Sequence, residues 1–191
     1  MDEFRHRVDD VEIPGGRGDG VPVSSLIELQ NGAKPVAMLT GQPEQHYLLS
    51  GSGGYGFITK LADMVGRVKA GKVVMTVDSG ETVLPPIAVY ASSLINPDCK
   101  IVLASSDHRL LAFSIGELKV MPKGRGLQLM SLTDGASLEH VMVTTSPEFT
   151  VVSVGRRGAE HQEKLRVADI DCKRGKKGKV LEISGRLKSL S

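Results

Sequence analysis

Leu48-Leu-Ser-Gly-Ser-Gly-Gly-Tyr-Gly-Phe57 joins two short apolar runs through a turn of small residues, which is the pattern of a β-hairpin. Corresponding turns occur at Ser105–Arg109, after the apolar run Ile101–Leu103, and at Gly155–Gly158, after Val151–Ser153. The quoted stretch is therefore one copy of a repeated β unit.

Each repeat also carries a basic glycine loop before its last predicted strand. With Gly20, Gly71, Gly126 and Gly178 as anchors, the intervals are 51, 55 and 52 residues. Such a period, with about four strands in each unit, predicts propeller-like blades around an axis, because a single blade would leave one face unburied. We predict one all-β domain over 1–191, with a partial repeat at 1–32 and three full repeats at about 33–84, 85–137 and 138–191. Because the chain begins inside a repeat, we interpret it as a fragment of a longer polypeptide.

Short β-type runs bounded by turn residues are frequent along the chain, whereas helical periodicity is scarce. The candidate strands lie at 35–40, 46–50, 55–59, 73–77, 87–90, 100–104, 110–113, 141–144 and 150–154, with further short strands starting near Leu127 and Val180.

The basic glycine loops contain lysine and arginine but no acid in all three full repeats. Equivalent positions of a radial repeat lie on the same edge, so we expect a discontinuous positive rim. Lysine and arginine neutralise phosphates and release counterions, and glycines let a backbone approach closely. The predicted DNA-binding residues are Arg67, Lys69, Lys72, Lys119, Lys123, Arg125, Lys173, Arg174, Lys176, Lys177 and Lys179, with Arg156 and Arg157 as an extension of the rim.

Charge is unevenly distributed although the whole chain carries only +2. Residues 1–32 have a net charge of −4 and residues 164–191 a net charge of +6. A basic end points weakly to a polyanionic partner.

The sequence matches two enzyme motifs, but neither match has the neighbouring structure or residues that the motif requires. Gly51–Gly56 matches G-x-G-x-x-G, but a predicted strand follows it where a dinucleotide site needs a helix. Gly66–Lys72 resembles a P-loop, but Val73 replaces the Ser or Thr that holds Mg²⁺. The five histidines lack metal-ligand spacing, and Cys99 and Cys172 lack paired spacing. We expect no catalytic residue, no metal and no cofactor in this chain, and two reduced thiols.

Hydropathy predicts no membrane segment, because no apolar stretch approaches the length of a span. The N-terminus also lacks the apolar centre of a signal peptide. We expect a cytoplasmic and monomeric fragment.

Leu48–Phe57, Leu61-Ala-Asp-Met-Val-Gly-Arg-Val-Lys-Ala-Gly-Lys72 and Val83-Leu-Pro-Pro86 together resemble the C-terminal domains of the gyrase A and topoisomerase IV A family. The resemblance implies a β-pinwheel whose blades exchange strands and whose basic perimeter carries DNA. It implies a parent that is an ATP-dependent type IIA topoisomerase, with ATP and Mg²⁺ bound elsewhere, in an A2B2 tetramer with the ATPase subunit. The domain would direct duplex DNA for relaxation and decatenation, and so for chromosome segregation.

Pro14-Gly-Gly-Arg-Gly18 is the nearest match to the basic glycine box of the gyrase A proteins, but it lacks the upstream bases. This departure favours topoisomerase IV over gyrase and implies DNA bending or weak wrapping. Because fewer repeats are visible than the five or six usual blades, we expect an open or broken disc. Two alternatives stay open at this point: a propeller-like scaffold for protein interactions, and the equivalent gyrase A domain.

Overall fold

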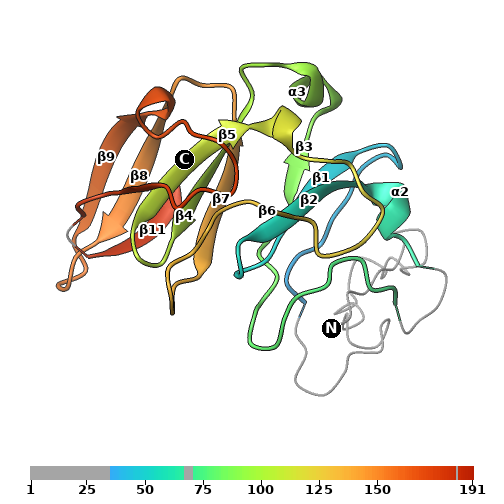
Figure 1. Cartoon of the computed structure of the whole chain (residues 1–191), viewed down its shortest axis with the longest axis horizontal. Coiled ribbons are helices and arrows are strands. Elements are labelled where there is room, and N and C mark those ends of the chain that lie inside the picture. Colours follow the sequence, from blue (N-terminus) through green and yellow to red (C-terminus); the bar gives the residue numbers. More distant parts are fainter. Residues whose placement is uncertain (1–34, 67–70, 184) are drawn as a thin grey trace, which may run out of the picture.

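The computed structural model describes residues 35–66, 71–183 and 185–191, and it shows three antiparallel sheets standing side by side (Figure 1). The first sheet is built on the hairpin of β1 (His46–Ser50) and β2 (Tyr55–Lys60). Its outer strands are β3 (Ile87–Val89) beside β1 and β6 (Leu127–Gln128) beside β2. The Gly51–Gly56 stretch thus forms a hairpin turn, as predicted.

The second sheet repeats this arrangement one unit further along the chain. Its hairpin consists of β4 (Lys100–Ser105) and β5 (Arg109–Ser114). β7 (Leu138–Thr144) pairs with β4, and β10 (Lys179–Val180) pairs with β5. Each of these two hairpins is therefore completed by two strands from later in the chain.

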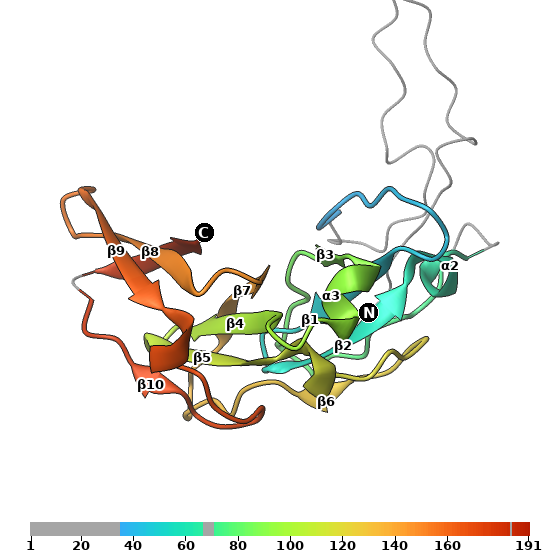
Figure 2. The same cartoon turned by 90° about the horizontal axis from the view of Figure 1, so that it is seen from above.

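The third sheet contains the hairpin of β8 (Glu148–Val154) and β9 (Glu160–Arg166), with β11 (Arg186–Leu190) beside β8. Short helical turns connect the strands: α2 (Leu61–Met64), α3 (Ala91–Ile95), and the 3-10 turns η2 (Ile115–Glu117) and η3 (Val167–Asp169). In Figures 1 and 2 the three sheets of the described ranges form a row and do not close into a barrel. The all-β prediction is confirmed.

Alternating side chains of the second hairpin explain how the row is held together. Ile101, Leu103 and Phe113 point into an apolar cluster shared with the first sheet, where Leu48 and Ile58 contribute. Val102, Leu110 and Ala112 face the other way and pack against Phe149 and Val151 of the third sheet. Because strand side chains alternate, both faces of the second sheet are buried. Its strands consequently read as continuous apolar runs.

Two predicted strands are not strands in the structure. Residues 35–40 pair with no other described segment, and residues 73–77 form only an isolated bridge at Met75. In the other repeats, the runs equivalent to residues 35–40 are β3 and β7, and those equivalent to residues 73–77 are β6 and β10. All four pair with the hairpin of the preceding repeat. Residues 35–40 and 73–77 have no such hairpin to pair with in the described ranges. Apolar composition alone therefore does not make these residues a β-strand.

Two observed strands, β9 and β11, were not among the residue ranges predicted as strands, although the repeat implies a strand after the Gly155–Gly158 turn, where β9 lies. β9 has the sequence Glu-His-Gln-Glu-Lys-Leu-Arg, and all of its side chains except that of Leu165 are exposed. An exposed edge strand lacks the apolar signal on which the sequence prediction relied. Cys99 is buried, Cys172 is exposed, and neither forms a disulfide. No helix in the described ranges is long and apolar enough to cross a membrane.

Candidate nucleic-acid interface

The middle loop, residues 119–126, lies along the first sheet through backbone contacts. Val120 forms a bridge with Ile58. The Gly124 N–H donates to the Val74 carbonyl at 2.9 Å, and the Thr76 N–H donates to the Gly124 carbonyl at 3.1 Å. These bonds hold the loop directly beside the segment that follows the first basic loop, residues 67–72.

The last loop, residues 173–179, docks in the same way one repeat later. Asp171, just before the loop, bridges to Ala112 of β5. The Gly175 N–H donates to the Leu129 carbonyl at 2.8 Å, and the Ser131 N–H donates to the Lys176 carbonyl at 3.0 Å. Because Leu129–Ser131 follows the middle loop almost at once, the two loops form one continuous border. In Figure 2 both loops run along the lower side of the molecule.

The anchor glycines are required by the backbone at these loops. Gly126 and Gly178 have φ angles of +86° and +74°. A Cβ added to Gly126 would lie 2.3 Å from the Gly56 carbonyl oxygen, and one added to Gly178 would lie 2.4 Å from the Leu110 carbonyl oxygen. Both the positive φ and the close approach exclude a side chain. The spacing of these glycines along the sequence therefore reflects one recurring contact.

Lysines of the two loops are exposed and form no ion pair with any residue that the structure describes. Among the described residues, no carboxylate lies within ion-pair distance of their ammonium groups. The six exposed lysines are Lys119, Lys123, Lys173, Lys176, Lys177 and Lys179, the last of which is also the first residue of β10.

Cations on the strands behave differently, because most of them pair with acids. The ion pairs are Lys100 with Asp171 at 2.8 Å, Arg109 with Asp107 at 3.1 Å, Lys164 with Glu148 at 2.5 Å, Arg166 with Asp169 at 2.9 Å, Arg186 with Glu139 at 3.7 Å, and Lys188 with Glu160. Uncompensated positive charge is thus concentrated in the loops.

Arg125 is the exception within the middle loop. Its Nη1 lies 2.6 Å from Oδ2 of Asp78, and its Nη2 lies 3.4 Å from Oε1 of Glu81. The guanidinium also stacks over the ring of Tyr55, 4.1 Å from the ring centroid. The charge of Arg125 is therefore compensated within the protein.

Arg174 also makes contacts that hold its loop in place. Its Nη1 donates to the Gln128 carbonyl at 2.5 Å, and its backbone N–H donates to the Glu117 carboxylate at 3.2 Å. The residue is half-buried. These contacts fasten the last loop to the segment beside β6.

The remaining predicted residues belong to other loops or lie outside the described ranges. Lys72 is half-buried and its Nζ donates to the Asp63 carbonyl at 2.6 Å. Arg67 and Lys69 lie outside the described residues. Arg156 and Arg157 are exposed at the turn between β8 and β9, which Figure 2 places at the side opposite the two loops. The structure does not bring these two arginines together with the loop lysines.

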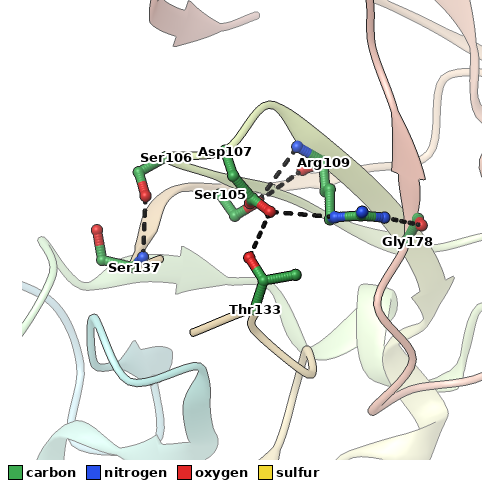
Figure 3. Close-up of polar contacts among 7 residues, drawn as sticks. All are labelled: Ser105, Ser106, Asp107, Arg109, Thr133, Ser137 and Gly178. Carbon is green, nitrogen blue, oxygen red and sulfur yellow. Dashed lines mark hydrogen bonds and ion pairs between the residues drawn. The ribbon is translucent and has the colours of Figure 1, made fainter. Parts of the chain in front are cut away.

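A cluster of hydrogen bonds around the Asp107 carboxylate joins the last loop to the second sheet (Figure 3). Asp107 accepts hydrogen bonds from Ser105 Oγ at 2.5 Å, Thr133 Oγ1 at 2.6 Å and Arg109 Nε at 3.1 Å. Arg109 Nη1 in turn donates to the Gly178 carbonyl at 3.4 Å. Partial burial raises the pKa of Asp107, but the hydrogen bonds from Ser105, Thr133 and Arg109 outweigh burial and hold the pKa below its ordinary value.

Sequence reasoning missed these acids because it examined each loop by itself. Glu81 and Arg125 are 44 residues apart, and Asp107 and Thr133 are 26 residues apart. A residue-by-residue comparison of aligned repeats is the only signal that could have suggested the pairs. Among the described residues, no group of three or more His, Cys, Asp or Glu side chains is placed to hold a metal ion.

No family model matches the chain. The chain is 72% identical to the A subunit of DNA topoisomerase 4 from Neisseria gonorrhoeae over 97% of its own length, which is 24% of that protein. It is 26% identical to the Escherichia coli K12 protein of the same name over 91% of the chain and 23% of that protein. The chain therefore spans about a quarter of the length of these relatives.

Solved structures show the same architecture. The C-terminal domain of E. coli ParC superposes with a TM-score of 0.79 at 23% identity, covering 92% of this chain and 71% of that one. The gyrase A C-terminal domain superposes with a TM-score of 0.65 at 18% identity, covering 91% of this chain and 58% of that one. The fold is thus the β-pinwheel. By sequence identity and shared architecture, the chain belongs to the topoisomerase IV A family, in the region of the C-terminal β-pinwheel domain.

Proposed function

We propose that this chain is a non-catalytic domain that binds double-stranded DNA along the border formed by the middle and last loops, and bends it. The observation that carries the proposal is the contrast between the two classes of cation. Six loop lysines are exposed and outside ion pairs with described residues, whereas the strand cations are largely paired with carboxylates.

Phosphate contacts are the chemistry that suits such a border. Lysine is a flexible point charge that neutralises a phosphate without reading a base, so the binding would show little sequence preference. If all six lysines contact phosphates, log K would fall with log salt with a slope of about −5. A duplex that follows successive loops would curve with them, at an elastic cost repaid by the added contacts.

Within this proposal the predicted residues take different roles. The lysines of the two loops contact phosphate, whereas Arg125 and Arg174 hold their loops in position through the contacts described above. Arg67 and Lys69 stay predicted DNA contacts outside the described residues, and the Lys72 ammonium is already bound to the Asp63 carbonyl. Arg156 and Arg157 would meet only a duplex that extends around the third sheet.

For the whole protein we propose the A component of an ATP-dependent type IIA topoisomerase. The domain would orient a duplex for strand passage in relaxation and decatenation, and would so serve chromosome segregation in the bacterial cytoplasm. The partners would be DNA, the remainder of the same polypeptide, and an ATPase subunit in an A2B2 assembly. ATP and Mg²⁺ would bind outside this chain, which would hold no cofactor of its own.

The test replaces four lysines of the last loop by glutamine, at Lys173, Lys176, Lys177 and Lys179. The matched control removes the same charge from paired cations of the third sheet, at Lys164, Arg166, Arg186 and Lys188. At about 0.1 M salt the loop variant should bind a random duplex about a thousandfold more weakly, with a clearly shallower salt slope. The control should bind within about threefold of wild type, because these charges lie farther from the border and are screened.

Equal losses in both variants would show that net charge and not the border holds DNA. A wild-type chain without measurable duplex affinity, but with a salt-tolerant protein complex, would support the interaction scaffold instead. Melting temperatures of both variants should stay close to wild type, because the replaced side chains are exposed.

A further inference from the structure

The middle and last loops place different residues before their anchor glycines. Arg125 precedes Gly126, and Lys177 precedes Gly178. Both glycines meet the second strand of a hairpin at equivalent positions, Gly56 in β2 and Leu110 in β5. The two cations therefore occupy the same place in successive repeats, yet only the first is neutralised by described carboxylates.

The neutralising acids come from the connection that follows the first basic loop. Backbone bonds fix the correspondence of this connection between repeats: the Ser52 N–H donates to the Thr82 carbonyl and the Ser106 N–H to the Ser137 carbonyl, both at 2.8 Å. Counting back from Thr82 and Ser137, Asp78 corresponds to Thr133 and Glu81 corresponds to Ala136. The second repeat thus has no acid at either of these two positions.

A carboxylate nonetheless lies beside the hairpin turn in both repeats. In the second repeat it comes from the turn itself and not from the connection. A Cβ added to Gly53 would lie 1.7 Å from Oε1 of Glu81, so the glutamate carboxylate fills the space beside the turn. Asp107 stands at the position equivalent to Gly53. Its carboxylate pairs with Arg109 of β5, which replaces Tyr55, and it leaves the loop lysine unpaired. The carboxylate beside the turn therefore pairs with the loop residue Arg125 in one repeat and with the strand residue Arg109 in the next.

The geometry around Arg125 is that of a bound oxyanion. Two oxygens from separate carboxylates meet the two ends of the guanidinium fork, at 2.6 and 3.4 Å, and the Tyr55 ring supports its face. A phosphate presents two oxygens to the same fork. Asp78 is exposed, with 59% of its side chain accessible, so that an incoming phosphate can replace it.

From these contacts we propose that Asp78 and Glu81 form an acidic screen that competes with DNA phosphate for Arg125. The inference rests on the proposed function and deepens it. The screen makes the middle loop the weaker half of the border, while the last loop engages DNA first. Arg125 becomes an additional phosphate contact only when DNA displaces the two carboxylates, so the affinity of the border is graded from one repeat to the next.

The experiment compares Asp78→Asn/Glu81→Gln with the control Asp98→Asn/Glu163→Gln, which removes the same charge from exposed acids elsewhere. Duplex affinity of the 191-residue chain is measured by fluorescence anisotropy over a salt series. The screen variant should bind roughly fivefold to tenfold more tightly at about 0.1 M salt, with a slope steeper by about 0.9, which corresponds to one added phosphate contact. The control should change affinity by less than about twofold.

A second arm repeats the screen variant in an Arg125→Gln background. The gain should disappear there, because the released contact no longer exists. A gain that persists without Arg125, or one equal to the control, would overturn the screen. Since Glu81 also accepts a bond from the Asp78 N–H at 3.0 Å, the single variant Asp78→Asn keeps that turn intact and should show part of the gain.

The outcomes separate the two proposals. If the wild type binds DNA and neither Asp78→Asn nor Asp78→Asn/Glu81→Gln binds more tightly, the screen is overturned and the proposed function stands. If neither wild type nor the screen variant binds DNA, the proposed function fails and the screen fails with it. Binding that appears only when the acids are removed supports the screen and counts against duplex binding by the wild-type chain.

Discussion

Two junctions between repeats use the same backbone frame and arrange their charges in opposite ways. In the first junction, where the β1–β2 turn meets the middle loop, Asp78 and Glu81 neutralise the loop residue Arg125. In the second junction, where the β4–β5 turn meets the last loop, Asp107 neutralises the strand residue Arg109. Local charge balance is kept in both, but only the second junction leaves its loop cation exposed. The comparison shows that a repeat can set the charge of its surface without changing its fold.

The largest expected effect tests the backbone contact that the two junctions share, in which an anchor glycine lies against the second strand of a hairpin. Gly178→Ala and Gly126→Ala should each lower the free energy of unfolding by about 3 kcal/mol, because the added Cβ meets a carbonyl and φ is positive. The control Gly158→Ala, at φ +80° with open space around it, should cost about 1 kcal/mol. Denaturant titration measures all three. Unequal losses at Gly126 and Gly178 would mean that the frames differ.

The carboxylates should differ in their contribution to stability. Asp107→Asn should cost about 2 kcal/mol, because Asp107 accepts three side-chain hydrogen bonds, one from an arginine. Glu81→Gln should cost about 0.5 kcal/mol, because its pair with Arg125 is longer and partly exposed. The same denaturant titration distinguishes them. A larger loss at Glu81 would show that the first junction depends on its carboxylate more than the second junction does.

Acidic pH should remove the difference in the free energy of unfolding between wild type and Asp107→Asn. Hydrogen bonds hold the pKa of folded Asp107 below its unfolded value of about 3.9. Its stabilisation is therefore complete above about pH 4 and is lost as the pH falls through the lowered pKa. Unfolding measured from about pH 7 to about pH 2.5 should show a constant difference that shrinks only at the acidic end. A difference that shrinks near neutral pH would contradict the lowered pKa.

The smallest expected effect concerns the aromatic partner in the first junction. Tyr55→Leu should cost about 0.5 to 1 kcal/mol through loss of the contact with the Arg125 guanidinium. The control Tyr90→Leu replaces a tyrosine that is 69% exposed and should be close to neutral. A double-mutant cycle with Arg125→Gln isolates the contact. A coupling energy of zero would show that the ring only fills space.

The hairpins could be predicted because their signal is local. Apolar runs such as Ile101–Leu103 recur on both sides of a turn, and both faces of the second sheet are buried. β9 could not be found in this way, because its side chains lie in solvent and pairing with β8 alone defines it. Residues 73–77 show the reverse case, where an apolar run packs beside Leu49 and Phe57 but pairs with no hairpin strand in the described ranges.

The candidate site divides along the same line. Lys173, Lys176 and Lys177 could be identified by counting charges in a loop, and the structure finds them exposed. Arg125 looked equivalent to them, but its charge is compensated by residues 44 and 47 positions earlier in the chain. The opposite placement of Arg156 and Arg157 was equally invisible, because it depends on where the third hairpin turns.

The amino-acid sequence alone determined the repeat, its hairpins, its glycine anchors and the positive sign of its loops, because each of these is written in neighbouring residues. Only the tertiary structure decided which positive charges remain uncompensated and which strands complete each sheet. The physical reason is that ion pairs and β-ladders join residues from different repeats. Such contacts form only when the sheets are packed side by side.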